Sequence, residues 1–290
     1  MKRKTWFWAL TPVAVALSLY GCGNGSDSDL AVDNNAQSCS VVSGTGSAVV
    51  VGSGLPGDPA APEAASGYRL GYKAKQSSNY MVVANTPLAT KAGCDVLKAG
   101  GTAVDAAVAV QAVLGLVEPQ SSTIAGSAFM MYYDAANKKV VAYDGRETAP
   151  AAATGYYLAR QDQSNASSPA PVPSARRSGR SIGVPGVMRM LDMAHKEHGK
   201  LAWAPLFDEG IRLASSGYKI PGRMGDAIRT NAANLQLDAN AVAAYFNADG
   251  TPKTTGTVTT NLPYAQSLRT LATGGADAMY SGPLAEAIVA

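Results

Sequence analysis

The sequence has few of the residues that bind metals or cross-link small exported folds. It contains two histidines and three cysteines in 290 residues, and neither type recurs at the spacing of a zinc site. His195 and His198 lie three residues apart on an expected helix, but no third ligand cluster accompanies them, so we interpret them as ordinary surface residues. The sequence therefore predicts neither a metal site nor a disulfide framework, and we expect no cofactor.

Charge is also scarce. Charged residues make up 16% of the chain and hydrophobic residues 47%, which is typical of a globular protein with a substantial core. The formal net charge of +3 equals the charge of Lys2, Arg3 and Lys4 at the extreme N-terminus. Without these three residues the chain is neutral, so we expect no nucleic-acid partner.

The three basic residues begin a segment with the features of an export signal. An apolar run over residues 6–19 follows them, too short to span a bilayer comfortably, and then Cys22 after a small residue. This pattern predicts a lipoprotein signal over residues 1–22, with Cys22 lipidated as the new N-terminus. The alternative is a plain secretory signal in which Cys22 is incidental. We expect an exported, periplasm-facing envelope lipoprotein, and Gly23 favours the outer membrane of a Gram-negative host.

Residues 23–76 are rich in Gly, Ser, Asp, Asn, Ala and Pro, and are predicted to be a flexible linker between the membrane anchor and a folded part, residues 77–290. Export permits a disulfide between Cys39 in this linker and Cys94. Cys94 lies in a helical pattern beside small residues, however, and is expected to be a small packed side chain.

Two consecutive helices are predicted at the centre of the chain. The first, over residues 87–98, begins with a proline and ends before two glycines. Thr102 and Asp105 then form a capping-box pattern that starts the second helix, over residues 103–117. The second helix is apolar on all sides, so other layers must cover it.

Two strands, residues 129–133 and 139–143, are expected to form a hairpin after a loop of small residues. Arg146 follows the hairpin. A guanidinium at the mouth of an apolar hairpin can bind a carboxylate through two parallel hydrogen bonds, which lysine cannot do. The alternative is that Arg146 only pairs with Asp144 or Glu147 at the surface.

The remaining elements are predicted from apolar periodicity: a buried strand over residues 80–84 and helices over residues 187–198, 204–216, 224–235, 262–273 and 284–290. Residues 158–181 are expected to form a polar loop. Its arginines, Arg176, Arg177 and Arg180, are interpreted as a solvated cluster, with substrate steering as the alternative.

Six stretches of the chain resemble, in the same order, the gamma-glutamyltransferases. They are residues 100–109, 118–122, 144–150, 183–186, 194–200 and 275–282. The resemblance runs from about residue 81 to residue 290. No single stretch is decisive, but their joint order is specific.

The resemblance implies a mixed α/β fold of the N-terminal-nucleophile hydrolase type, an αββα sandwich present only in part, with this chain as the N-terminal portion of the large subunit. It implies a precursor that cuts itself into two subunits and exposes a threonine, whose own α-amino group activates it to attack the γ-glutamyl amide of glutathione. It also implies that Arg146 binds the α-carboxylate of the glutamyl group and that Glu147 orients Arg146. The partners are then a γ-glutamyl substrate and the missing C-terminal part or small subunit.

The family's processing threonine, in a Thr-Thr-His-type context, has no counterpart in this sequence. Two threonine pairs, at 254–255 and 259–260, lie in a polar loop beside no histidine and are interpreted as loop residues. We therefore expect this chain to contain the carboxylate site but no catalytic residue, to be inactive alone, and to be less stable than the complete protein. The alternatives are an amidase of glutaryl-type substrates and a non-catalytic envelope lipoprotein that binds γ-glutamyl peptides.

Overall fold

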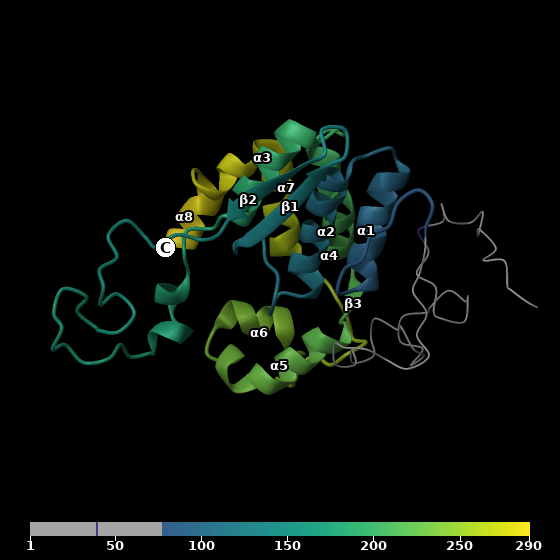
Figure 1. Ribbon diagram of the computed structural model, residues 1–290. Coiled ribbons are helices and arrows are strands. Elements are labelled where there is room, and N and C mark those ends of the chain that lie inside the picture. The colour runs from purple at the N-terminus through teal and green to yellow at the C-terminus, as the bar shows by residue number, and fades with distance from the viewer. Residues whose placement is uncertain (1–38, 40–76) are drawn as a thin grey trace, which may run out of the picture. The chain divides into compact units, whose positions relative to one another are not determined.

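The computed structural model describes residue 39 and residues 77–290 of the chain (Figure 1). The predicted signal, most of the predicted linker and the lipidation at Cys22 lie outside the described residues. The described part is mixed α/β, with many helices and two small antiparallel sheets.

The elements follow one another along the chain in a helix-rich order. The α-helices are α1 (Pro87–Lys98), α2 (Ala103–Val117), α3 (Val187–His198), α4 (Asp208–Ser216), α5 (Gly222–Leu235), α6 (Ala239–Tyr245), α7 (Leu262–Gly274) and α8 (Pro283–Val289). The 3-10 helices are η1 (Ala175–Arg177), η2 (Gly179–Ser181), η3 (Ala204–Phe207) and η4 (Ala276–Met279). The strands are β1 (Ala128–Asp134), β2 (Lys139–Gly145), β3 (Tyr218–Lys219) and β4 (Val258–Thr259).

The starts of α1 and α2 are explained by local sequence, and both helices form where predicted. The Thr86 side chain accepts a hydrogen bond from the first turn of α1. At the start of α2, Thr102 and Asp105 form the predicted reciprocal capping box. These side chains satisfy backbone N–H groups that a helix start otherwise leaves without a partner.

Helix α2 lies at the centre of the packing. Ten of its fifteen residues are buried, and it contacts α1, α3, α4 and η3. The Tyr264 hydroxyl of α7 also donates a hydrogen bond to the carbonyl of Ala112, at 2.9 Å. Two hydrophobic clusters meet on α2, one shared with α3 and α7 and the other with α1, α4 and α5. The prediction that other layers cover this apolar helix is confirmed.

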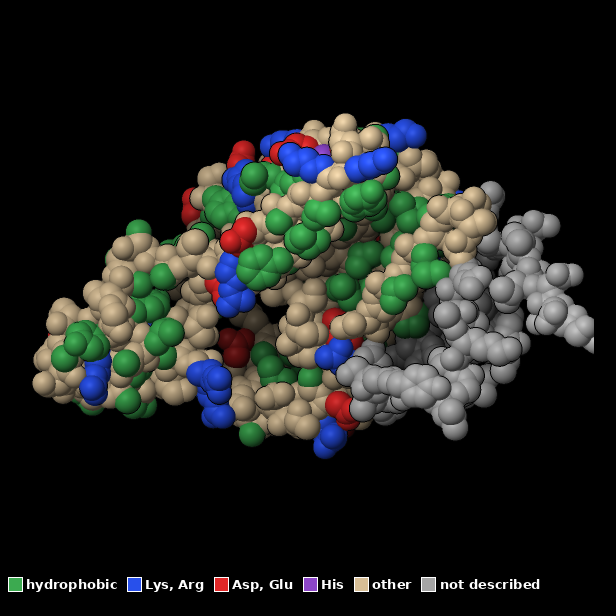
Figure 2. All heavy atoms as spheres, viewed as in Figure 1, with side chains coloured by type: hydrophobic (Ala, Val, Ile, Leu, Met, Phe, Trp, Pro, Cys, Tyr) green, Lys and Arg blue, Asp and Glu red, His purple; other side chains and the backbone are tan. Residues whose placement is uncertain are grey.

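Strands β1 and β2 form the predicted hairpin, one residue longer at each end of β1 and two residues longer at the end of β2. Alternate side chains face opposite sides of a strand. On the inner face, Tyr132 and Tyr143 pack toward α3. The outer face has four large hydrophobic side chains that are 55–71% exposed: Phe129, Met131, Tyr133 and Val140. In Figure 2 hydrophobic side chains line the hairpin on the side toward the viewer.

Asp105 has a second role, which its sequence position did not predict. Its buried carboxylate accepts hydrogen bonds from the backbone N–H groups of Lys200, at 3.0 Å, and Leu201, at 3.3 Å, just after α3. His195 lies 3.3 Å from the same carboxylate. One side chain therefore fixes the start of α2 to the end of α3.

The interpretation of both histidines as ordinary surface residues is wrong. The side chains of His195 and His198 are 14% and 19% exposed. His195 also lies 3.0 Å from the carbonyl oxygen of Leu201, and His198 stacks on Tyr132 with 4.0 Å between the ring centroids. No group of side chains suited to a metal ion occurs among the described residues.

Three local predictions are corrected. Residues 80–84 form no strand, because no described strand lies beside them to pair. The helix predicted over residues 204–216 begins as the 3-10 helix η3 and becomes α-helical only at Asp208. Helix α6, of seven residues, was not predicted.

Of the αββα sandwich expected from the family resemblance, the described residues form one helical layer and one sheet layer. Helices cover the inner face of the hairpin, and within residues 77–290 no second sheet stacks on its outer face. In the part of the chain that the structure describes, no helix has the length and apolar content needed to cross a membrane.

Candidate functional site

Arg146 follows β2, at a point where three chain segments meet. Its backbone N–H donates a hydrogen bond to the Asp144 carboxylate at 2.9 Å. Two residues later, Thr148 pairs with Val184 as an isolated antiparallel bridge, and the Val184 N–H donates to the Thr148 carbonyl at 2.8 Å. The backbone on both sides of Arg146 is therefore held by hydrogen bonds.

The third segment is the small-residue loop before β1. The carbonyl of Gly126 accepts hydrogen bonds from the N–H groups of Gly186, at 3.0 Å, and Val187, at 3.1 Å. This contact attaches the loop to the start of α3. Backbone thus approaches backbone at this loop of small residues.

Glycines make the close approach possible. A Cβ atom on Gly186 would lie 2.3 Å from the carbonyl oxygen of Gly145, and a Cβ atom on Gly145 would lie 2.6 Å from the Cβ of Met190. Both distances are far shorter than real carbon contacts, so any side chain there would push the hairpin exit away from α3. The two glycines set the position from which Arg146 projects.

The Arg146 side chain itself is accessible. It is 62% exposed, and its Nη2 lies 3.2 Å from Oε1 of Glu147, which is 34% exposed. A hydrogen bond from the Ser127 side chain, a backbone hydrogen bond and the nearby Arg146 charge hold the pKa of Glu147 below its usual range. Glu147 is therefore ionised at neutral pH and lies beside one edge of the guanidinium.

This geometry leaves most of the guanidinium available to a ligand. The group has five N–H donors in a planar fork, and within residues 77–290 the contact with Glu147 is its one ion pair. The ion pair between Arg146 and Glu147 matches the alternative expectation, in which Arg146 pairs with a neighbouring carboxylate at the surface. Such exposed pairs contribute only about 0–1 kcal/mol, so a ligand carboxylate can displace or join it.

A Gly-x-Ser-x-Gly motif was missed in the sequence. Residues 179–183 read Gly-Arg-Ser-Ile-Gly, the pattern of the serine hydrolase nucleophile elbow. That elbow requires a strand-to-helix turn, whereas Ser181 lies in the 3-10 helix η2 and its hydroxyl donates to the Ser178 carbonyl at 3.0 Å. We therefore assign this serine no catalytic role.

The three loop arginines do not form one steering cluster. Arg180 donates hydrogen bonds to the carbonyl oxygens of Tyr157, Arg160 and Gln161, so it fastens the loop to itself. Arg176 and Arg177 are exposed in η1. The interpretation as a solvated cluster holds for those two residues only.

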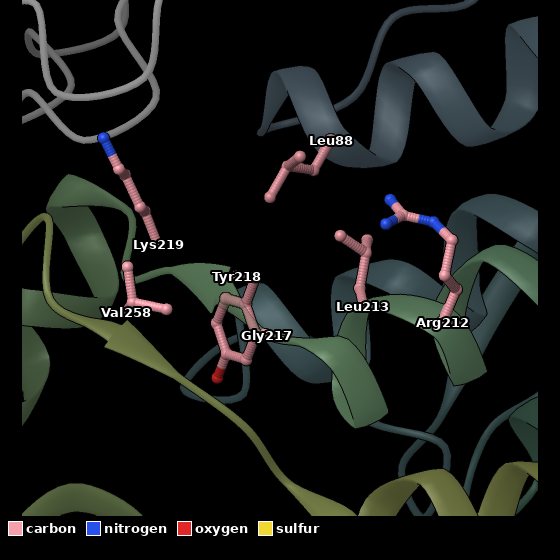
Figure 3. A pocket seen from close by; sticks show the side chains of 7 residues that line it. All are labelled: Leu88, Arg212, Leu213, Gly217, Tyr218, Lys219 and Val258. Carbon is pink, nitrogen blue, oxygen red and sulfur yellow. The ribbon is translucent and has the colours of Figure 1, made fainter.

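A cleft elsewhere on the molecule contains no predicted site residue. It lies between α1, α4 and the β3–β4 pair, as Figure 3 shows. Its lining residues are Leu88, Arg212, Leu213, Gly217, Tyr218, Lys219 and Val258. Arg212 is already held by Glu209 through two hydrogen bonds of 2.7 Å. The cleft therefore offers no convergent set of free polar groups comparable with the hairpin exit.

The chain is similar in sequence to glutathione hydrolases. Glutathione hydrolase 3 of Arabidopsis thaliana is 36% identical over 215 residues, which cover 74% of this chain and 32% of that protein. The glutathione hydrolase proenzyme of Bacillus subtilis is 34% identical over 211 residues, which cover 72% of this chain and 34% of that protein. The chain thus spans about a third of the length of these curated relatives.

Comparison with solved structures agrees with the sequence similarity. The gamma-glutamyltranspeptidase of Helicobacter pylori matches with a TM-score of 0.68 and 28% identity, over 74% of this chain and 60% of that one. A cephalosporin acylase from Bacillus halodurans matches with a TM-score of 0.58 and 24% identity, over 77% of this chain and 42% of that one, and shows the shared fold alone. The mixed α/β fold is therefore that of these hydrolases, over part of their chains. The model of the gamma-glutamyltranspeptidase family matches residues 89–290, and the chain belongs to this family.

Proposed function

We propose that the complete protein hydrolyses or transfers the γ-glutamyl group of glutathione and related amides, and that Arg146 binds the α-carboxylate of that group. The observation that carries the proposal is the contrast at Arg146 between a backbone at the junction of three hydrogen-bonded segments and a side chain that is 62% exposed. A ligand that binds there does not have to order the loop, so less of its binding energy is lost.

The chemistry of the substrate fits this position. A carboxylate accepts two parallel hydrogen bonds from a guanidinium, which fixes its orientation as well as its place. Holding the glutamyl group at its α end leaves the γ-carbonyl at a set distance, where a nucleophile can be positioned against it. Glu147 acts on this site through Arg146 and takes no part in the reaction itself.

The proposed nucleophile is a threonine outside these 290 residues, freed when the precursor cuts itself. One threonine of each pair at 254–255 and 259–260 makes other contacts, which supports that proposal. Thr259 is buried in β4 and accepts a hydrogen bond from Lys253 at 2.8 Å, and the Thr254 hydroxyl lies 3.3 Å from that of Thr257. The partial coverage of the relatives supports it further.

The outer face of the hairpin is the proposed packing surface for the rest of the protein. Large hydrophobic side chains rarely gather on the free surface of a monomer without a partner, and four of them do so here. We further propose that the mature protein is anchored through a lipid on Cys22, facing the periplasm from the outer membrane.

An assay with a γ-glutamyl anilide tests this function. The complete reading frame is expected to release the aniline, whereas this chain alone is expected to release none. Product from this chain alone would place the nucleophile within it and contradict the proposal. A glutaryl anilide, which lacks only the α-amino group, separates a γ-glutamyl enzyme from a glutaryl amidase.

Variants of the complete protein test the role of Arg146. We expect Arg146→Ala to raise KM about 10- to 100-fold, because charge-assisted hydrogen bonds contribute about 1.5–3 kcal/mol. The matched control is Arg176→Ala, which removes an exposed loop arginine and should leave KM unchanged. Equal KM values for the two variants would contradict the proposal that Arg146 binds the substrate.

A further inference from the structure

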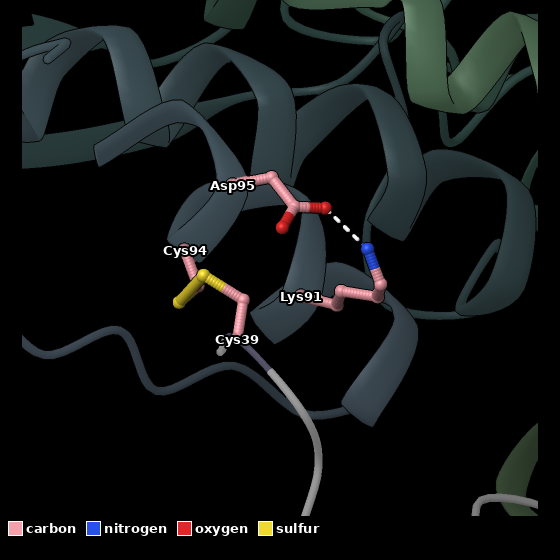
Figure 4. The surroundings of a disulfide bond; sticks show 4 residues. All are labelled: Cys39, Lys91, Cys94 and Asp95. Carbon is pink, nitrogen blue, oxygen red and sulfur yellow. Dashed lines mark hydrogen bonds and ion pairs between the residues drawn. A yellow bond between two sulfur atoms is a disulfide. The ribbon is translucent and has the colours of Figure 1, made fainter. Parts of the chain in front are cut away.

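Cys39 and Cys94 are joined by a disulfide, which corrects the expectation that Cys94 is merely a small packed residue. Their Cα atoms lie 5.5 Å apart, within the usual range for a disulfide. Cys94 lies in α1, beside Asp95, which pairs with Lys91 (Figure 4). Ala92 and Gly93 of the same helix are buried. The bond therefore ends on a helix of the core.

The connectivity of the chain gives this bond a consequence. A disulfide between positions 39 and 94 closes a covalent ring of the residues between them. Two covalent routes then join the N-terminal 38 residues to the helical core: the peptide backbone through residues 40–76, and the disulfide. A single break in residues 40–76 opens the ring and leaves the two parts joined.

Between Cys22 and α1, every basic residue of the sequence lies within this ring. From Thr5 to Tyr68 the chain has no lysine or arginine, and Arg69, Lys73 and Lys75 then follow within seven residues. A protease specific for basic residues can therefore cut the backbone between Cys22 and α1 only inside the ring. The segment from Cys22 to Cys39 offers it no site.

We propose that the Cys39–Cys94 disulfide retains the folded part on its N-terminal anchor after the backbone is cut at Arg69, Lys73 or Lys75, and that release requires reduction as well as proteolysis. The inference rests on the proposed lipid anchor at Cys22. The cut adds water across one peptide bond. The reduction is by a dithiol, which gives two electrons and two protons to form the Cys39 and Cys94 thiols and closes to its own cyclic disulfide.

The test uses the full chain, expressed with its signal in a Gram-negative host, on isolated membranes. After trypsin treatment, the cut molecules, which a reducing gel identifies by their smaller fragments, should still sediment with the membrane. Trypsin followed by dithiothreitol should move the cut molecules into the supernatant, and dithiothreitol alone should move none. In the Cys94→Ser variant, trypsin alone should release the folded part. Release of the cut wild-type chain by trypsin alone, to the same extent as Cys94→Ser, would overturn the inference.

A wrong anchor proposal can be distinguished from a wrong disulfide proposal before any protease is added. If the wild-type chain and Cys22→Ser both stay in the supernatant, the anchor proposal is wrong. The retention itself is then tested on the purified chain from Gly23 onward. After a limited trypsin digest, the large fragment that begins just after Arg69, Lys73 or Lys75 should appear on a denaturing gel only with reductant, because without reductant it stays joined to the segment that holds Cys39. The same fragment on a gel without reductant would overturn the disulfide link independently of the membrane.

Discussion

Helix α2 and the β1–β2 hairpin are neighbours in the sequence and both are rich in apolar residues, yet they are covered to different extents. Ten of the fifteen residues of α2 are buried, whereas Phe129, Met131, Tyr133 and Val140 on the hairpin are 55–71% exposed. Apolar residues on both faces of a strand are typical of a sheet with a layer on each side. The comparison shows that α2 is covered by neighbouring helices within residues 77–290, while the outer face of the hairpin is exposed there.

The same contrast places the candidate site. Arg146 follows β2 directly. The exposed Phe129 pairs with Asp144, only two residues before Arg146. A ligand held by Arg146 would therefore lie beside the open hairpin face and not inside the helical core. Substitutions in α2 should change stability, and substitutions at the hairpin exit should change binding.

The largest effect is expected in α2. Leu116→Ala removes a side chain that is 2% exposed, and such truncations cost about 2–5 kcal/mol. Urea unfolding followed by circular dichroism measures the loss. A change of no more than about 0.5 kcal/mol, within the range of surface substitutions, would contradict the enclosure of α2.

A smaller loss is expected at the link between α2 and the end of α3. Asp105→Ala leaves the N–H groups of Lys200 and Leu201 without their acceptor, and a lost acceptor costs about 1–3 kcal/mol. Asp105→Asn keeps one acceptor oxygen and should lose less. Equal unfolding midpoints for wild type and Asp105→Ala would show that the contact contributes nothing.

Alkaline pH should destabilise the α2 side of the molecule. Burial raises the pKa of Tyr218, whose hydroxyl donates to the carbonyl of Leu116 at 3.3 Å. Because the folded-state pKa exceeds the unfolded value near 10, unfolding releases a proton above that pH, and stability falls as pH rises further. The slope is at most about 1.4 kcal/mol per pH unit. Urea midpoints measured from pH 8 to 11 should fall less steeply for Tyr218→Phe.

The smallest effect is expected on the open hairpin face. Met131→Ala removes a side chain that is 71% exposed, so in this chain the free energy of unfolding should change by no more than about 0.5 kcal/mol. The same substitution in the complete protein should cost more, because there we propose that the face is covered. Equal, small changes in both proteins would leave the proposed packing surface without support.

Elements with local signals could be predicted from the sequence. Thr102 and Asp105 predicted the start of α2, because helix capping depends on residues within one turn. The position of Arg146 directly after the hairpin followed from the strand pattern in the same way. Its role in binding stays a prediction.

Contacts between distant positions could not be predicted. Cys39 and Cys94 are 55 positions apart, and Asp105 meets Lys200 across 95 positions. No local pattern specifies such pairs, since they depend on how the helices pack. The exposure of the hairpin face was missed for the same reason, although the unbroken apolar run in β1 was a signal that both faces are made to be covered.

The most direct test of the account is calorimetry of glutathione binding to this chain. We predict measurable binding that weakens at least about tenfold in Arg146→Lys, which keeps the charge but loses the planar fork. Glutathione amidated at the glutamyl α-carboxylate should show the same loss with the wild-type chain. Equal binding by wild type and Arg146→Ala, or no binding by either, would contradict the claim that Arg146 holds the carboxylate.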